Sequence, residues 1–391
     1  MPSKELLLIP GPTPVTDEIR AALAAETWSH TDPRFVEITK NCLEMTRQLL
    51  GCHDGEVFLV AGTGTLAMEM ALVNTVAPGE SILVLSQGYF GDRFEQIAKS
   101  FAIGVDVLRS EWGQRLDVAQ VKEQLAQKQY KAVTVTHVDT STGVEADLEA
   151  LVPVVKEHGA LFILDGVCAT AAIEEDMSKA YQGNPAYRID VVLSGSQKAI
   201  GVPPGLLLLG FSREALAARE AMDRVPAYYG DIKNWLPIMH NPAKYFATPA
   251  VNMVYAYEEG LKTVLAEGLG NRYRRHRATA RAVRAALATY GMRALAAEAI
   301  AASTLSCVLY PEGVDDAAFR GALAKKGVVV AGALGELAGK AFRIGHMGNT
   351  TLGDFKRALT IMAEVLDDMG HQVDAEAAVQ VLERVYQENL N

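Results

Sequence analysis

The chain has 391 residues, of which 49% are hydrophobic and 21% are charged, and its formal net charge at pH 7 is −10. This length favours two domains that share one site over a single core. The net negative charge argues against nucleic acid as a partner. No apolar run approaches the roughly 18 residues that a membrane-spanning helix needs, so no membrane partner is expected.

The four cysteines are scattered, with no Cys-x-x-Cys spacing and no paired histidine motif. They predict reduced packing residues and favour neither a disulfide framework nor a metal site. The first residues carry one cation and then a short apolar run that Pro10 interrupts, a pattern that differs from a signal peptide. These features together predict a cytoplasmic protein.

Strand-like and helix-like segments alternate through the first part of the chain. The strands are short, nearly continuous apolar runs, which is typical of a mostly parallel sheet covered by helices on both faces. Strands are expected at 56–61, 81–86, 105–109, 131–137 and 205–211, with two more that end at Asp165 and near Ser194. Helices are expected at 66–76, 91–101, 118–127 and 148–158.

The pattern changes after about residue 250. Long helices are expected at 251–267 and 271–290, followed by a smaller α+β unit. Its strands are expected at 305–310, 328–330 and 341–344, and its helices at 315–326 and 352–369. The last stretch, 374–388, has apolar positions at helical spacing and is expected to pack on the small domain or on a partner subunit.

Two charged residues stand at the ends of apolar strands, where ligands of such sheets collect. Asp165 closes the apolar run 160–164, and Lys198 lies between the strand near Ser194 and a Gly/Pro segment at 201–205. A lysine that forms a Schiff base with an aldehyde, and a carboxylate that holds a proton on a pyridine nitrogen, are what a pyridoxal phosphate enzyme requires. Either residue alone is as well explained by an ordinary charge in a strand-end loop, but the pair favours the cofactor.

Two short polar motifs fit the same cofactor. In the segment 62–65, Gly64 and Thr65 stand between a strand and a helix, where backbone N–H groups can hold an anion. A tight turn with a helix cap explains this motif by itself, but beside a Schiff-base lysine it predicts a phosphate cup. Ser141, in the segment 140–143, follows a strand end and can hydrogen-bond the phenolic oxygen of the cofactor. The alternative for Ser141 is a capped turn.

One aromatic residue and one arginine are the remaining site candidates, and a group of six further arginines has a simpler explanation. Phe90 lies just past a strand end and either stacks on the pyridine face or packs in the core. Arg343 lies inside an apolar strand, where a guanidinium needs an anion, supplied by a substrate carboxylate or by a structural salt bridge. Six further arginines crowd the helix expected at 271–290 together with His276, and we interpret them as a solvated face near a domain junction. They are Arg272, Arg274, Arg275, Arg277, Arg281 and Arg284.

These motifs resemble those of the class V aminotransferases of fold-type I, in the alanine–glyoxylate, serine–glyoxylate and serine–pyruvate branch. The most specific are Ser-Gly-Ser-Gln-Lys at 194–198 followed by Pro-Pro-Gly at 203–205, and the segments 164–167, 141–143 and 245–249. The resemblance covers nearly the whole chain, from 9–13 to the helix that follows 343–345. Two positions depart from many relatives: Phe90 where tryptophan is frequent, and Thr65 where some have histidine.

The resemblance implies an α/β fold of the PLP-dependent transferase type. A large domain with a mostly parallel seven-stranded sheet flanked by helices is expected, plus a smaller C-terminal α+β domain. The expected divisions are an N-terminal arm and substrate loop at 1–18, a large cofactor-binding domain at 19–262, and a small domain with a terminal helix at 263–391.

The resemblance also implies residue roles around pyridoxal 5'-phosphate. Lys198 is expected to carry the internal aldimine and to shuttle a proton between Cα and C4′, and Asp165 to bind the pyridine nitrogen. Gly64, Thr65 and Gln197 are expected to hold the phosphate, and Phe90 and Ser141 to contact the ring. The remaining roles concern substrate and dimer: Gly11 lines the substrate pocket, Arg343 clamps the substrate carboxylate, and Tyr245 and Thr248 reach the partner's cofactor phosphate in a homodimer.

The implied reaction is ping-pong transamination through the Lys198 aldimine and pyridoxamine phosphate. Alanine or serine is the expected donor and glyoxylate or pyruvate the acceptor, because no second basic pocket for a dicarboxylate is apparent in the sequence. Another donor (aspartate, ureidoglycine or an aminophosphonate) is the first alternative. A cysteine desulfurase is disfavoured because Cys307 lies in the apolar strand 305–310. A non-catalytic subunit of a soluble hydrogenase-type complex is the remaining alternative, without a metal cluster of its own.

Overall fold

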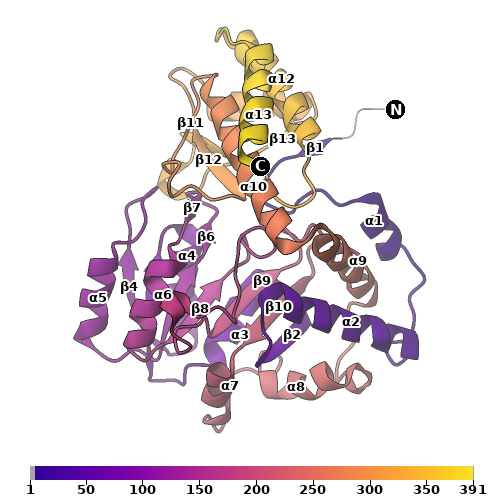
Figure 1. The fold of residues 1–391 in the computed structure, drawn as a ribbon, viewed down its shortest axis with the longest axis vertical. Helices are drawn as coiled ribbons and strands as arrows, with labels where there is room; N and C mark the ends of the chain where they lie inside the picture. The colour runs from indigo at the N-terminus through magenta and orange to yellow at the C-terminus, as the bar shows by residue number, and fades with distance from the viewer. Residues whose placement is uncertain (1–4, 391) are drawn as a thin grey trace.

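A computed structural model describes residues 5–390 of the chain. The large domain lies at the bottom of Figure 1 and the small domain at the top. The long helix α10 (Leu269–Ala288) runs from the junction of the two domains into the small one (Figure 1). Within these described residues, no helix combines the length and the apolar character that crossing a membrane requires.

The large domain is built on a seven-stranded sheet in the order β2-β10-β9-β8-β5-β3-β4. Every neighbouring pair is parallel except those of β10, which is antiparallel to both β2 and β9. The predicted mostly parallel seven-stranded sheet is therefore confirmed. The strands are β2 (Glu56–Ala61), β3 (Ser81–Ser86), β4 (Gly104–Arg109), β5 (Ala132–Thr136), β8 (Leu161–Asp165), β9 (Val191–Gly195) and β10 (Leu206–Phe211).

Helices cover both faces of this sheet, which explains the continuous apolar runs of its strands. In β8, Leu161 and Ile163 belong to one core, whereas Phe162 and Leu164 belong to the other. Successive side chains of a strand alternate between faces, so a strand buried on both sides has few polar positions. One face carries α3 (Gly64–Val73), α4 (Tyr89–Ser100), α7 (Arg213–Glu220) and α8 (Ile232–His240). The other carries α1 (Asp17–Leu23), α2 (Pro33–Leu50), α5 (Val118–Gln127), α6 (Leu148–Glu157) and α9 (Val251–Glu267).

The small domain has a four-stranded antiparallel sheet in the order β11-β12-β15-β14. Its strands are β11 (Arg293–Ala294), β12 (Leu305–Leu309), β14 (Ala331–Gly332) and β15 (Ala341–Gly345). Its helices are α11 (Asp316–Lys325), α12 (Leu352–Asp368) and α13 (Ala375–Leu390), beside α10. The terminal helix α13 packs in this domain, where Ala378 and Leu382 share a core with Ala282 and Ala286 of α10.

The N-terminal arm joins the small domain. Its strand β1 (Leu6–Leu7) pairs in parallel with β13 (Val328–Val329), and Leu8 lies in the same core as α10 and α12. A short hairpin, β6 (Val138–Asp139) with β7 (Val144–Glu145), extends from the end of β5. The predicted division at 262/263 falls inside α9 and stays a prediction.

Candidate active site

A cavity of about 160 Å³ lies at the carboxyl ends of the central strands. It brings together Gly64, Thr65, Phe90, Asp165, Gln197 and Lys198 from the predicted set, which come from four separate segments of the chain. Its other lining residues are Thr63, Met68, Arg93, Thr136, Val138, Thr140, Val167 and Cys168. The carboxyl edge of the parallel strands, where the sequence placed the site, is therefore also where this cavity opens.

Lys198 lies on the turn that follows β9, and the N-terminal arm fixes this turn. Thr13 donates from its hydroxyl to the Lys198 carbonyl (2.7 Å) and from its backbone N–H to the Gln197 carbonyl (3.0 Å). The Lys198 amine donates to the carbonyl of Pro10. Gly11 beside it has φ of +100°, and a Cβ there would lie 2.3 Å from Lys198 Cδ, so this position favours glycine. The arm therefore lies directly against the lysine.

Asp165 ends β8 and is buried beside Lys198 in the cavity. Its Oδ1 accepts a hydrogen bond from the Val167 N–H at 2.9 Å. Burial raises the pKa of Asp165 to about 7, and the charges of Asp139 and Glu175 act in the same direction. A cationic N–H donor in the cavity would hold this carboxyl ionised, because an opposite charge at short range favours the charged form.

A second buried polar atom beside Asp165 also points to a ligand. Thr136 pairs with Asp165 in the register of β5 and β8, and its hydroxyl is buried without a hydrogen-bond partner in the described chain. Buried hydroxyls are ordinarily hydrogen-bonded. Since Thr136 lines the cavity, a polar group bound there can satisfy it. The residues of this wall therefore fit a heteroaromatic ring with a protonated nitrogen.

Another part of the cavity wall, at the start of α3, suits an anion. Helix α3 begins at Gly64 after the N-cap Thr63, whose hydroxyl accepts from the Leu66 N–H (3.4 Å). The first N–H groups of a helix lack helical partners and carry a partial positive charge. Arg93 adds a full charge: its Nη1 donates to the Thr65 hydroxyl at 3.3 Å. This end of the cavity therefore fits a phosphate group.

Arg93 was not among the residues that the sequence analysis singled out. Its guanidinium lies over the Phe90 ring, 4.8 Å from the ring centre, and no carboxylate within residues 5–390 pairs with it. Arg93 follows Phe90 by three residues, and both lie on α4, so they share one helix face. That spacing was the signal that could have identified it.

Ser141 does not line the cavity, and its neighbour Thr140 does. The Ser141 hydroxyl donates to Asp139 Oδ1 (2.6 Å) and accepts from the Tyr89 N–H (3.0 Å). Asp139 Oδ2 also accepts from the N–H groups of Phe90 (2.9 Å) and Gly91 (3.0 Å). This network orients the start of α4 and therefore Phe90. A contact of Ser141 with the cofactor ring stays a prediction.

Arg343, on β15 of the small domain, does not line the cavity but approaches its wall at Thr140. It donates from Nε to the Gly332 carbonyl (2.9 Å) and from Nη1 to the Thr140 carbonyl (3.5 Å). Burial lowers its pKa, and none of the ion pairs formed by residues 5–390 includes it. The structural salt bridge considered from the sequence is therefore not formed within that range, and donors of the guanidinium remain for a substrate carboxylate.

Tyr245 and Thr248 lie apart from the cavity of their own chain. Tyr245 packs on Trp235 with ring centres 5.4 Å apart, in an aromatic cluster whose members Tyr228 and Phe246 are exposed. Thr248 is exposed. Their predicted contact with the cofactor phosphate of a partner subunit stays a prediction.

Two further buried groups lie near the site. His137 Nδ1 lies 2.7 Å from Glu175 Oε1; burial lowers the pKa of His137, but this hydrogen bond and the Glu175 charge outweigh burial and raise it. Cys168 lines the cavity, and burial raises the pKa of its thiol to about 11. All four cysteines are buried, Cys307 included, so none offers the exposed thiolate that a cysteine desulfurase needs.

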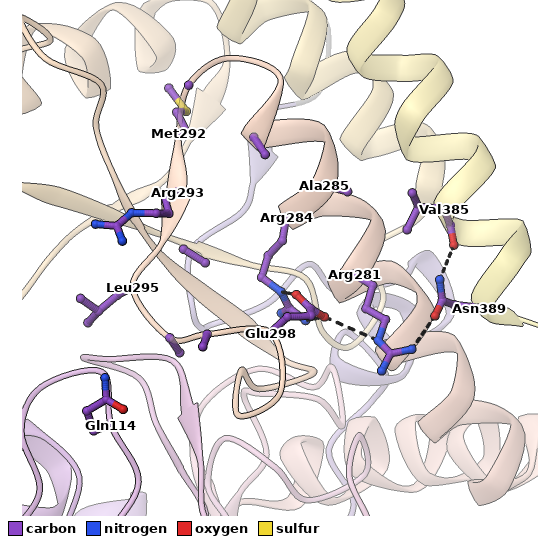
Figure 2. A pocket seen from close by; sticks show the side chains of 15 residues that line it. Gln114, Arg281, Arg284, Ala285, Met292, Arg293, Leu295, Glu298, Val385 and Asn389 are labelled. Carbon is purple, nitrogen blue, oxygen red and sulfur yellow. Dashed lines mark hydrogen bonds and ion pairs between the residues drawn. The ribbon is translucent and has the colours of Figure 1, made fainter.

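A larger cavity of about 1030 Å³ lies between α10, β11 and α13 (Figure 2). In it Glu298 binds Arg284 at 2.7 Å, and Arg281 donates to Asn389 at 2.6 Å (Figure 2). None of the predicted site residues lines it. It also lacks a lysine, so the smaller cavity at the strand ends remains the candidate active site.

Comparison with known proteins agrees with this geometry. The soluble hydrogenase 42 kDa subunit of Anabaena cylindrica is 34% identical over 99% of this chain and 100% of its own. The alanine–glyoxylate aminotransferase 1 of Saccharomyces cerevisiae is 33% identical over 89% of this chain and 93% of its own. Among solved structures, the ureidoglycine–glyoxylate aminotransferase of Bacillus subtilis superposes with a TM-score of 0.91, at 27% identity and 99% coverage of both chains.

Other relatives, each 30% identical, include an L-aspartate–glyoxylate aminotransferase of Paracoccus denitrificans and a serine–glyoxylate aminotransferase of Methylorubrum extorquens. The family model described as Aminotransferase class-V matches residues 17–343, which contain every charged residue of the cavity. With the fit of the cavity to a pyridine ring and a phosphate, this match identifies the chain as a member of the class-V aminotransferases, with pyridoxal 5'-phosphate as its cofactor.

Proposed function

We propose that the protein transfers the amino group of alanine or serine to a small 2-oxo acid, glyoxylate or pyruvate. The observation that carries this proposal is the shared cavity of Lys198 and the buried Asp165, with Arg343 reaching its wall from the small domain. Both substrates need one carboxylate site, and Arg343 supplies it. Relatives named as alanine–glyoxylate and serine–glyoxylate aminotransferases support alanine or serine as donor and glyoxylate as acceptor.

When bound, the cofactor supplies an aldehyde and a pyridinium ring that accepts electrons from the substrate. Lys198 would hold the cofactor through that aldehyde, and its amine, when free, would move the proton at the substrate Cα. Asp165 would hold the proton on the ring nitrogen. The N–H groups at the start of α3 would hold the phosphate, and Thr136 would offer its unpartnered hydroxyl to a polar ring substituent.

Arg343 orients the substrate so that its Cα meets the lysine. A guanidinium offers two parallel N–H donors to a carboxylate, which fixes the plane of the substrate as well as its position. The N-terminal arm closes the other side, because Pro10 and Gly11 touch the Lys198 side chain.

The proposal is tested by half-reactions with the cofactor-loaded protein. L-alanine, L-serine and L-aspartate are each added without acceptor, and the keto acid formed is measured by mass spectrometry. The proposal expects alanine or serine to react fastest, and the amino group to reach glyoxylate or pyruvate afterwards. A protein that converts neither alanine nor serine would contradict it.

Aspartate as donor is a second candidate, because of Arg93. The sequence analysis found no second basic group, yet Arg93 lines the cavity without a carboxylate partner in the described chain. A second guanidinium can bind the distal carboxylate of aspartate. In that case Arg93→Gln lowers kcat/KM for aspartate at least about tenfold and leaves that for alanine unchanged. Equal loss for both donors would assign Arg93 to the cofactor phosphate instead.

The proposed assembly is a homodimer in which Tyr245 and Thr248 reach the cofactor phosphate of the partner. The exposed aromatic side chains Tyr228 and Phe246 beside Tyr245 support an interface there, because large exposed apolar patches mark interaction sites. The likeness to the soluble hydrogenase 42 kDa subunit keeps a role in a larger complex open to test. Near-stoichiometric recovery of a partner together with no cofactor binding would favour that role.

A further inference from the structure

The arginine-rich helix α10 is only partly a solvated face. Arg274 and Arg277 are exposed, as the sequence analysis predicted for the whole set, but Arg272 is 1% exposed and His276 is fully buried. The prediction was therefore wrong for these two residues, and Arg275 and Arg284 are only partly exposed, each paired with a glutamate. A helix repeats every 3.6 residues, so residues at 272 and 276 share a face opposite to those at 274 and 277.

The buried guanidinium of Arg272 has three partners, one for each nitrogen. Its Nη1 donates to Glu267 Oε2 at 2.6 Å, which supplies the counter-charge. Its Nε donates to the Ala171 carbonyl at 2.9 Å, and its Nη2 to the Ala199 carbonyl at 2.5 Å. A buried arginine with all three nitrogens bound has a defined position, because the planar group fixes the directions of its donors.

The two carbonyls belong to the segments that carry the reactive residues. Ala171 lies in the segment after Asp165, and Ala199 directly follows Lys198. The segment after Asp165 is well held without Arg272, because Thr170 N–H donates to the Gly166 carbonyl (2.8 Å) and its hydroxyl to Glu175 (2.5 Å). Arg272 thus links a rigid segment to the lysine turn.

The backbone at Ala171 supports this assignment. Its φ is +71°, a conformation that a residue with a Cβ rarely adopts. Such conformations persist where the surrounding structure determines them, and they gather at functional sites. The carbonyl of Ala171 is the one that Arg272 binds, so the strained residue and the buried cation form one unit.

We propose that Arg272 is a positioning residue, which holds the Lys198 turn at a fixed place relative to Asp165. This inference rests on the proposed function, since it concerns the same lysine. The lysine amine must reach the cofactor aldehyde while Asp165 holds the far side of the ring. Arg272 touches neither, and acts through the main chain of Ala199 and Ala171.

The test compares the binding of two forms of the cofactor. Pyridoxal phosphate binds partly through the lysine, whereas pyridoxamine phosphate has no aldehyde and cannot. Arg272→Lys keeps a positive charge beside Glu267, but a single ammonium cannot reach both carbonyls. The proposal predicts that Arg272→Lys weakens binding of pyridoxal phosphate about tenfold or more and leaves the affinity for pyridoxamine phosphate unchanged.

Arg277→Lys is the matched control, since it makes the same change on the exposed face of the same helix. It is expected to leave both affinities as in the wild type. Arg272→Met also removes the charge. If this variant folds, its affinity for pyridoxal phosphate is expected to fall further than that of Arg272→Lys. The melting temperature of each variant reports its folding.

The outcomes separate the inference from the function on which it rests. A wild-type protein that binds neither form of the cofactor contradicts the proposed function. The inference alone is overturned if the wild type binds both forms and the Arg272→Lys variant shows one of three results. The variant loses affinity for both forms equally, it keeps both affinities, or it fails to fold. Equal loss or failure to fold would assign Arg272 to the general stability of the domain junction.

Discussion

Replacing Asp165 with asparagine is expected to stabilise the cofactor-free protein while weakening its hold on the cofactor. The side chain is 4% exposed, and in the cofactor-free fold its pKa is raised from 3.8 to about 7, chiefly by burial. Asparagine has the same shape and its oxygen can still accept from the Val167 N–H. The variant therefore removes a buried charge without removing that hydrogen bond.

The sign of the pH dependence follows from the two pKa values. The folded protein binds the proton of Asp165 more tightly than the unfolded chain does, so the stabilisation is complete below about pH 3.8 and lost as the pH rises to about 7. At about 1.36 kcal/mol for each pH unit, the loss amounts to about 4 kcal/mol above pH 7. Asp165→Asn escapes this loss, so its advantage over the wild type is larger at pH 8 than at pH 5.

The assay is thermal unfolding of cofactor-free wild type and variant at both pH values, with cofactor affinity measured alongside. We expect a melting temperature several degrees higher for Asp165→Asn at pH 8. Its affinity for pyridoxal phosphate should fall by about 10- to 100-fold, because a hydrogen bond between charged groups is lost. Asp117→Asn, at an exposed N-cap, is the control and should change little, since both residues cap helices equally well. A variant whose advantage does not change with pH, or which binds the cofactor like wild type, would refute the reasoning.

Three further changes probe other parts of the structure. Arg343→Gln should raise KM for both the amino donor and the 2-oxo acid by about 10- to 100-fold, because the arginine that binds their carboxylates is lost, while cofactor affinity should change little. An unchanged KM for either substrate would show that Arg343 does not bind the substrate carboxylate. Gly11→Ala should lower kcat/KM and the free energy of unfolding, the latter by about 1 kcal/mol, because φ is +100° and the new Cβ would contact Lys198. A variant with the same kinetics as the wild type would show that the N-terminal arm does not contact the lysine in solution. Arg219→Ala should lower the free energy of unfolding by about 1.5–3 kcal/mol with unchanged kinetics, because the buried guanidinium and its charge-assisted hydrogen bonds to the partly buried Asp231, at 2.7 and 2.8 Å, are lost. A loss below about 1 kcal/mol would contradict this account.

The sheet and the lysine–aspartate pair were predictable because each depends on local sequence. Strands buried on both faces consist of continuous apolar runs, so a charge at the end of one, as at Asp165, is conspicuous. The reversed direction of β10 was not predictable, because an antiparallel strand buried on both faces has the same composition as its parallel neighbours. Nor did the sequence analysis identify α2, α7 and α8, which lie outside the alternating segments that it followed.

The partners of side chains depend on the tertiary structure and could not be predicted. Asp139 and Ser141 orient Phe90 through contacts between the hairpin and the start of α4. The direction of Arg272 depends on where the two loops beneath α10 come to lie, and six arginines on one helix look alike in sequence. Helical periodicity separates 272 and 276 from 274 and 277 but does not say which face is buried.

The central claim is that Lys198 holds the cofactor, and reductive labelling tests it most directly. The protein is loaded with pyridoxal phosphate, reduced with borohydride and digested, and the modified peptide is identified by mass spectrometry. The account predicts one stoichiometric pyridoxyl group on Lys198 of the wild type and none on the Lys198→Ala variant. A label on another lysine, or an unlabelled wild type after loading, would contradict it.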